Sequence, residues 1–134
     1  MRLCSIASGS SGNCIYTGGE HTHLLVDTGI SKKRVEEGLK ALNIKGDELS
    51  GILITHEHID HIAGLGVLSR RYGIPIYTTE KTADAIQETK SVGKIPEELF
   101  HPVCAEEAFT IKDLTVNPVS YTHLRAHETR EDLV

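Results

Sequence analysis

Residues 51–66 read GILITHEHIDHIAGLG and place four metal-binding side chains directly after a short apolar run. The run from Ile52 to Thr55 is largely β-branched, which predicts a buried β-strand, and the pattern after the fourth of these side chains predicts a helix. A solvated, His-rich loop is the simpler interpretation. Four coordinating residues within six positions at the end of such a strand favour a metal site instead. The four side chains are those of His56, His58, Asp60 and His61.

The spacing of these four residues predicts two neighbouring metal ions. In an extended chain alternate side chains point the same way, so His56 and His58 are expected to converge on a first ion. Asp60 and His61 are expected to open the following helix and to face a second ion. Imidazole with carboxylate suits zinc, manganese or iron, and a cluster without Cys argues against a closed structural zinc site. We therefore expect two divalent cations, with zinc preferred and manganese or iron as alternatives.

The segment THEHIDH at residues 55–61 resembles the His-x-His-x-Asp-His signature of the metallo-β-lactamase-fold hydrolases. Three flanking segments narrow the resemblance to the YycJ-type branch, whose members are thought to be double-strand DNA exonucleases. The resemblance runs from Arg2 to about Pro118. The flanking segments are SIASGSSGNC at 5–14, LLVDTGIS at 24–31 and IAGLGVLSRRYGIPIY at 62–77.

This resemblance implies an α/β fold, the N-terminal half of an αβ/βα sandwich with a mixed sheet and helices on one face. It implies a metal-dependent hydrolase that cleaves phosphodiesters, as a DNA exonuclease does, with a metal-bridged hydroxide and with Asp60 as ligand and catalytic residue. A thioester or lactone hydrolase of the same fold is the alternative. A third alternative is that the chain itself is an inactive partial metal binder, because the later ligands of the family lie outside it.

Asp27 ends the apolar run of residues 24–26, and two roles are open to it. It can cap the helix that follows, or it can support a metal-bound histidine through a hydrogen bond. The second role is preferred because Asp27 falls where the resembling family carries the Asp of its first motif. The sequence Asp-Thr-Gly at 27–29 also resembles the aspartic-protease signature, but such a protease has no use for the His cluster.

The polar segment of residues 8–13, SGSSGN, predicts a turn between two strands. The simpler interpretation is that the turn serves only geometry. The functional alternative is that Ser10, Ser11 and Asn13 hold a phosphate of the substrate, as loops with free backbone N–H groups can.

Other polar residues are expected to have no part in the site. His21 and His23 are expected to be solvated because neither has a second ligand at a useful spacing. His101 is expected to be structural, and Arg70 and Arg71 are expected to be exposed charges rather than phosphate contacts.

Composition predicts one globular unit with an aliphatic core, since 39% of the 134 residues are hydrophobic but only two are Phe and none is Trp. The net charge of −5 gives no general attraction to nucleic acid, although a local basic groove is compatible with it. Three unpatterned cysteines without a leader favour a reducing, cytoplasmic location. We expect no membrane segment, because no apolar run approaches the roughly 20 residues that span a bilayer.

Hydrophobic periodicity predicts three strands first and then alternating helices and strands. Ser31 and Thr79 are expected to cap helices, and Ile62, Leu65, Val67 and Leu68 are expected to form the apolar side of another. With helices on one face and no second sheet, the other face is expected to stay exposed. The expected strands are 2–7, 14–17, 23–26, 52–55, 74–77, 100–104 and 109–117.

The last residues, 119–134, resemble a translated sequencing-library adapter. We therefore expect residues 1–118 to form a partial domain and 119–134 to be a non-native read-through tail. His123 and His127 have the four-residue spacing of a zinc-binding pair on a helix, but they lie in this tail and are not predicted as ligands.

Overall fold

A computed structural model describes residues 2–104 and 107–117, and its centre is a six-stranded mixed sheet. The first three strands pair antiparallel through short loops, and each later strand adds in parallel after a longer connection. The predicted α/β class with a mixed sheet is confirmed. In spatial order the strands are β1 (Arg2–Ala7), β2 (Cys14–Gly18), β3 (His23–Val26), β4 (Gly51–Leu53), β5 (Ile76–Thr78) and β6 (Phe100–Pro102).

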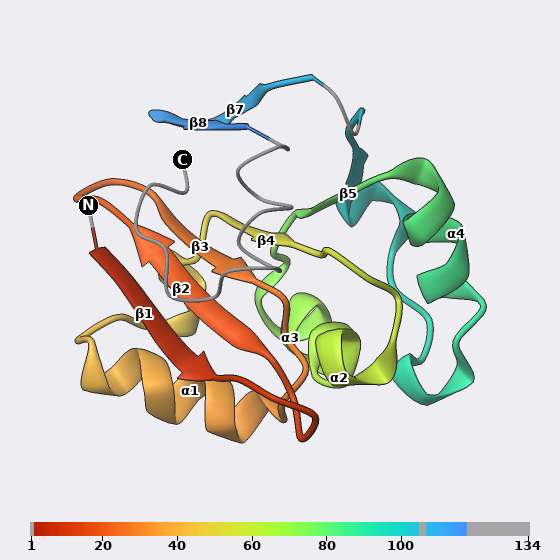
Figure 1. Cartoon of the computed structure of the whole chain (residues 1–134), viewed down its shortest axis with the longest axis horizontal. Helices are drawn as coiled ribbons and strands as arrows, with labels where there is room; N and C mark the ends of the chain where they lie inside the picture. Colours follow the sequence, from red (N-terminus) through yellow and green to blue (C-terminus); the bar gives the residue numbers. More distant parts are fainter. Residues whose placement is uncertain (1, 105–106, 118–134) are drawn as a thin grey trace.

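Helices α1, α2 and α3 lie on one side of the sheet, as Figure 1 shows. Ser31 caps α1 by accepting from the backbone N–H of Arg34, and Thr79 caps α4 by accepting from that of Thr82, so both predicted caps are confirmed. The helices are α1 (Lys32–Ala41), α2 (Ile59–Ile62), α3 (Leu65–Tyr72) and α4 (Glu80–Gln87), with 3₁₀ turns η1 (Gly46–Glu48), η2 (Lys90–Val92) and η3 (Glu97–Leu99).

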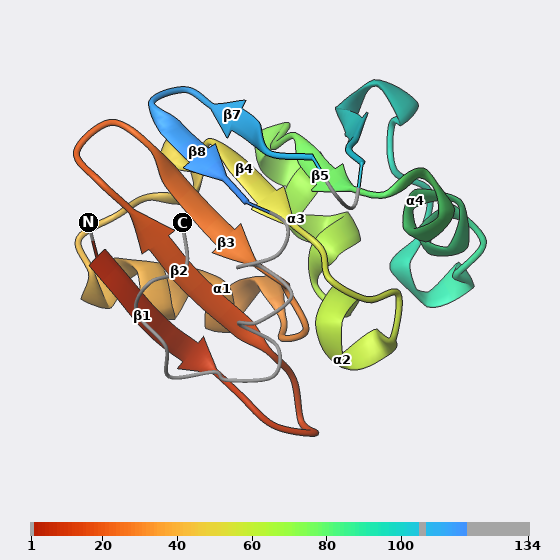
Figure 2. The same ribbon diagram turned by 45° about the horizontal axis from the view of Figure 1, so that its top comes forward.

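A two-stranded hairpin lies over the other face of the sheet (Figure 2). It consists of β7 (Phe109–Ile111) and β8 (Leu114–Val116), where a single strand over 109–117 was expected. The chain reverses at Lys112, which has a left-handed φ of 53° without being a glycine, so the sequence carries no Gly signal for this turn. Asp113 accepts a hydrogen bond from the Thr22 hydroxyl and ties the turn to the start of β3.

Side chains alternate across β3 and β4 and fill two separate cores. Leu25 and Ile52 belong to the core under the helices, whereas Leu24, Val26 and Leu53 face the hairpin. The expectation of an uncovered far face is therefore wrong for the described residues. The core on the hairpin side consists of Ile15, Leu24, Val26, Leu53, Ile111, Leu114 and Val116.

The chain after β4 differs from the expected strand and single helix. Strand β4 ends at Leu53 rather than Thr55, and the helix divides into α2 and α3. The backbone N–H of Gly64 donates to Thr28 O at 2.8 Å, which ties this break to the loop after β3. Val67 is 48% exposed and does not belong to the apolar side predicted for it, because α3 starts afresh at Leu65.

Candidate metal centre

The four predicted ligands lie in the loop after β4 and in α2, at the carboxyl ends of parallel strands. His58 occupies the N-cap position of α2, and Asp60 and His61 lie within its single turn, as expected. His56 follows the strand rather than belonging to it, so alternation along an extended strand does not explain how His56 and His58 are placed. A turn that brings residue 61 back beside residue 56 explains the clustering better.

The three imidazole rings and the carboxylate lie close together. Ring centroids are 5.2 Å apart for His56 and His61 and 5.9 Å apart for His56 and His58. His61 Nε2 lies 3.7 Å from Asp60 Oδ2. Because the His56 ring is closer to His61 than to His58, the geometry does not divide the four residues into two separate pairs. Assignment of each ligand to a first or second ion stays a prediction.

The buried carboxylate of Asp27 accepts hydrogen bonds from two residues of the motif segment, Thr55 and His61. It is 2% exposed and accepts from Thr55 N–H at 2.8 Å, from Thr55 Oγ1 at 2.7 Å and from His61 Nδ1 at 2.7 Å. Ser31, not Asp27, caps α1. The predicted contact between Asp27 and a histidine of the motif is thus present, and support of a metal-bound ring is the role this contact favours.

The hydrogen bond to Asp27 determines how His61 faces Asp60. With Nδ1–H donating to the carboxylate, Nε2 keeps a lone pair on the side of Asp60. His61 is only 2% exposed, so packing holds its ring in this orientation. Metal binding through this Nε2 stays a prediction.

The Gly- and Ser-rich loop between β1 and β2 reaches the centre through Asn13. Asn13 is 8% exposed, and its Nδ2 donates to Gly9 O at 3.1 Å and to Asp60 O at 3.3 Å. Ser10 and Ser11 are exposed. Asn13 therefore closes the loop and holds it against Asp60. Phosphate binding by Ser10, Ser11 and Asn13 stays a prediction.

The chemistry of these four donors suits a divalent metal ion, but the four side chains do not form a complete coordination shell. Three imidazoles and one carboxylate are the donors that zinc and other divalent transition metals accept. Within residues 2–104 and 107–117, no three His, Cys, Asp or Glu side chains already form a group that could hold an ion. Further ligands would have to complete each coordination shell.

Most polar residues that were predicted to have no part in the site lie outside the candidate metal centre. His21 is exposed, and His101 stacks on Tyr77 with ring centroids 5.1 Å apart. His23 is not simply solvated, since its Nδ1 lies 2.7 Å from Tyr16 Oη and the side chain is half-buried. Arg70 and Arg71 are exposed, as expected, and Arg70 Nη1 also donates to Lys94 O at 2.9 Å.

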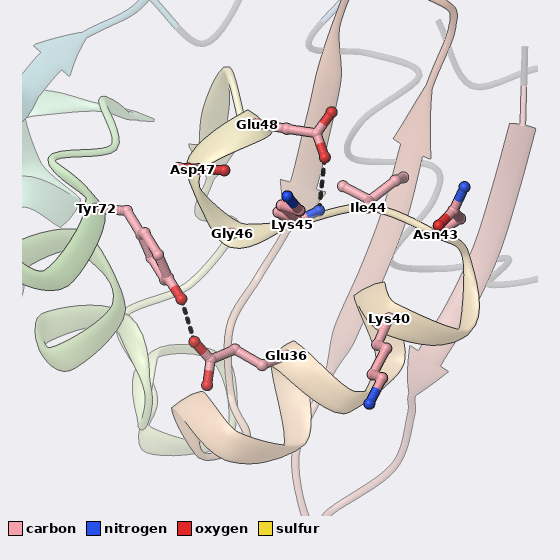
Figure 3. Close-up of a pocket in the computed structure, with 9 residues that line it drawn as sticks. All are labelled: Glu36, Lys40, Asn43, Ile44, Lys45, Gly46, Asp47, Glu48 and Tyr72. Atoms are coloured by element: carbon pink, nitrogen blue, oxygen red, sulfur yellow. Dashed lines mark hydrogen bonds between the residues drawn. The ribbon is translucent and has the colours of Figure 1, made fainter.

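A pocket of about 500 Å³ opens on the helical side of the sheet, and none of the motif residues lines it. In Figure 3 the side chains of Glu36 and Tyr72 point toward one another across its wall, and they are hydrogen-bonded. This bond and a second one from Lys32 hold the pKa of Glu36 below its usual range. The pocket is lined by Glu36, Lys40, Asn43, Ile44, Lys45, Gly46, Asp47, Glu48 and Tyr72.

Comparisons with known proteins show what the chain is similar to. The chain is 41% identical over 123 residues to "Exodeoxyribonuclease YycJ" of Bacillus anthracis, covering 92% of this chain and 46% of that protein. It is 41% identical over 118 residues to "Exodeoxyribonuclease WalJ" of Streptococcus pneumoniae R6, covering 88% and 44%. The solved structure of Rm3 metallo-beta-lactamase matches with a TM-score of 0.71 at 18% identity, covering 86% of this chain and 47% of that one.

The chain thus spans about half the length of the curated relatives it matches. In the part of the chain that the structure describes, no helix has the length and apolar character needed to cross a membrane. The predicted tail, including His123 and His127, lies outside the described residues, so the boundary at 118 stays a prediction. Residues 7–123 match the metallo-beta-lactamase superfamily, and with the mixed sheet and the clustered His-x-His-x-Asp-His motif they establish that the chain belongs to this superfamily.

Proposed function

We propose that the full-length parent protein is a metal-dependent DNA exonuclease. The observation that carries the proposal is the 41% identity to two exodeoxyribonucleases over about nine-tenths of this chain. The matched part includes the whole ligand motif and Asp27, and the 2.7 Å contact between Asp27 and His61 supports a shared role for them. Nucleic acid is therefore the proposed substrate.

In this proposal His56, His58, Asp60 and His61 hold two divalent ions, zinc first and manganese or iron as alternatives. Such ions, when bound, lower the pKa of a coordinated water and neutralise charge on a phosphate. Asp60 serves as a ligand and orients the nucleophile. Asp27 fixes the ring of His61, and the exposed Ser10 and Ser11 lie at the tip of a loop that Asn13 holds beside Asp60.

The chain of 134 residues is proposed to bind metal weakly and to have no turnover by itself, since it spans less than half of each nuclease relative. A net charge of −5 means that DNA has to be attracted by a local surface rather than by the whole molecule. Cys4, Cys14 and Cys104 are free thiols, which supports the cytoplasm as the proposed compartment.

Substrate preference tests the proposal against the thioester or lactone alternative. The full-length protein, with zinc or manganese added, is given linear duplex DNA with one labelled end, a glutathione thioester and a simple lactone. We expect progressive release of nucleotides from a DNA end and negligible hydrolysis of the other two. Rapid thioester or lactone hydrolysis with intact DNA would favour the alternative, because the ligand motif leaves the substrate open.

A further inference from the structure

Thr55 links the carboxylate of Asp27 to the first histidine of the motif. Its Oγ1 lies 2.7 Å from Asp27 Oδ2 and 3.1 Å from His56 Nδ1, and its backbone N–H donates to Asp27 Oδ1 at 2.8 Å. Asp27 follows β3 and Thr55 follows β4. These strands are parallel, so the two residues lie at the same edge of the sheet. Thr55 therefore contacts both the supporting carboxylate and a predicted ligand. Through it the position of the carboxylate can influence the orientation of the ligand's ring.

The number of protons along these contacts determines which nitrogen of His56 carries its hydrogen. A carboxylate has no proton and only accepts, so the single O–H of Thr55 donates to Asp27. Oγ1 has no second proton and can meet His56 Nδ1 only as an acceptor. The hydrogen of a neutral His56 therefore stands on Nδ1, and Nε2 keeps its lone pair.

We propose that Thr55 is a positioning residue that holds His56 in the Nδ1–H tautomer. Asp27 then fixes the tautomers of two imidazole rings. It contacts His61 directly at 2.7 Å and reaches His56 through the Thr55 hydroxyl. An unrestrained neutral imidazole exchanges between two tautomers, and only the one with a bare Nε2 offers that nitrogen to a cation. The inference rests on the proposed metal-binding role of His56 and is independent of the substrate.

Nitrogen-15 spectra of the histidine side chains in the metal-free, full-length protein test the tautomer directly. We expect His56 to show a protonated Nδ1 and an unprotonated Nε2, with its signals identified by their loss in His56→Gln. A His56 whose hydrogen stands on Nε2 overturns the proposal. This result does not depend on DNA cleavage, so the proposal and the nuclease function can fail separately.

Two substitutions test whether Thr55 is the cause. Thr55→Val removes the hydroxyl at similar volume, and Thr55→Ser keeps it. We expect the Val protein to show both tautomers at His56 and zinc binding weaker by about 10-fold in competition with a chromogenic chelator, and the Ser protein to match the wild type.

Thr110→Val is the matched control, because Thr110 is an exposed threonine on β7. Its tautomers and zinc affinity should stay unchanged. A folded Thr55→Val protein with the wild-type tautomer and zinc affinity overturns the proposal. If Thr55→Val does not show a cooperative thermal transition, the spectra of the wild type and of Thr55→Ser decide the outcome.

Discussion

Asp27 combines an unusual backbone conformation with three accepted hydrogen bonds. Its φ is 64°, in the left-handed region, where a non-glycine residue costs about 1 kcal/mol. The same conformation directs its carboxylate to Thr55 and His61, and these contacts offset the cost. Strain kept at one residue beside the candidate ligands is consistent with a functional role for that residue.

Asp27→Asn should weaken both metal binding and folding. The amide can still accept from one partner, but its NH₂ group meets a second donor at Thr55 or His61. We expect metal affinity of the full-length protein to fall by about 10- to 100-fold. The free energy of unfolding should fall by about 1–3 kcal/mol because buried donors lose their acceptor.

Chelator competition and denaturant unfolding measure these two effects. Asp47→Asn is the matched control, since Asp47 is exposed in η1. Wild-type metal affinity in Asp27→Asn would restrict Asp27 to a structural role.

Cys14 should be chemically inert in the folded protein. Burial, and then the charge of Asp27, raise the pKa of this thiol to about 12. At pH 8 the thiol is therefore protonated, and only thiolates react quickly with alkylating reagents. We expect iodoacetamide to label the exposed Cys104 and to spare Cys14, as peptide mass analysis would show. Equal labelling of both residues in the folded protein would mean that Cys14, at the start of β2, is accessible to the reagent.

At the scale of elements, three segments meet at the centre through backbone bonds of 2.8 Å. Asn13 N–H donates to Asp60 O, Gly29 N–H donates to Asn13 O, and Thr28 N–H donates to His61 O. These bonds join the β1–β2 loop, the β3–α1 loop and α2. The close approach leaves no room for a side chain at residue 29, where a Cβ would overlap the Asp60 carbonyl.

Gly29→Ala should therefore separate these segments. We expect a loss of about 1–3 kcal/mol in the free energy of unfolding, as for other overpacked sites, together with weaker zinc binding because Asp60 shifts. Gly19→Ala is the matched control, since nothing lies within 4 Å of a Cβ built there. Equal stability of the two variants in denaturant titrations would contradict the close contact.

Local sequence signals predict the first elements correctly. Contacts between residues far apart in the sequence leave no such signal and are not predicted. Strand β3 and the caps at Ser31 and Thr79 lie where propensity and spacing placed them. The turn at Lys112 lacks the usual glycine, so the sequence predicts one strand where the structure has a hairpin. The sequence predicts Thr55 as the end of a strand, because nothing in its immediate neighbours indicates a bond to a residue 28 positions away.

The same distinction holds for the site. Four donors within six positions predict the candidate ligands, and the family resemblance predicts Asp27, but the contact between Asn13 and Asp60 joins residues 47 positions apart. Sequence spacing does not encode such pairs. A polar residue next to a turn glycine, as Asn13 is, was the only local sign.

At the scale of the whole molecule, the hairpin converts an open sheet into a layered one. It covers Leu24, Val26 and Leu53 with Ile111, Leu114 and Val116. Among the described residues, only Ile59 and Val67 are large hydrophobic side chains classed as exposed. The matched nuclease relative and the matched solved structure are each about twice as long as the part that this chain covers.

Val116→Asp should open the hairpin side of the sheet. Val116 is 1% exposed, and an unpaired carboxylate cannot remain in this apolar core. We expect stability to fall by about 2 kcal/mol or more and binding of a hydrophobic dye to rise as the sheet face becomes accessible. Thr115→Asp, on the exposed side of the same strand, should change neither. Similar melting temperatures for the two variants would mean that the hairpin does not cover the sheet.

Degradation of linear duplex DNA by the full-length protein, before and after His58→Ala, tests the proposed metal-dependent nuclease most directly. His58 is exposed at the start of α2, so its removal should leave the thermal transition unchanged. We predict that the wild type loses activity when metal is removed and regains it with zinc or manganese, and that His58→Ala stays slower by orders of magnitude under the same treatment. Activity of the variant close to that of the wild type, after controlled removal and return of metal, would contradict the account.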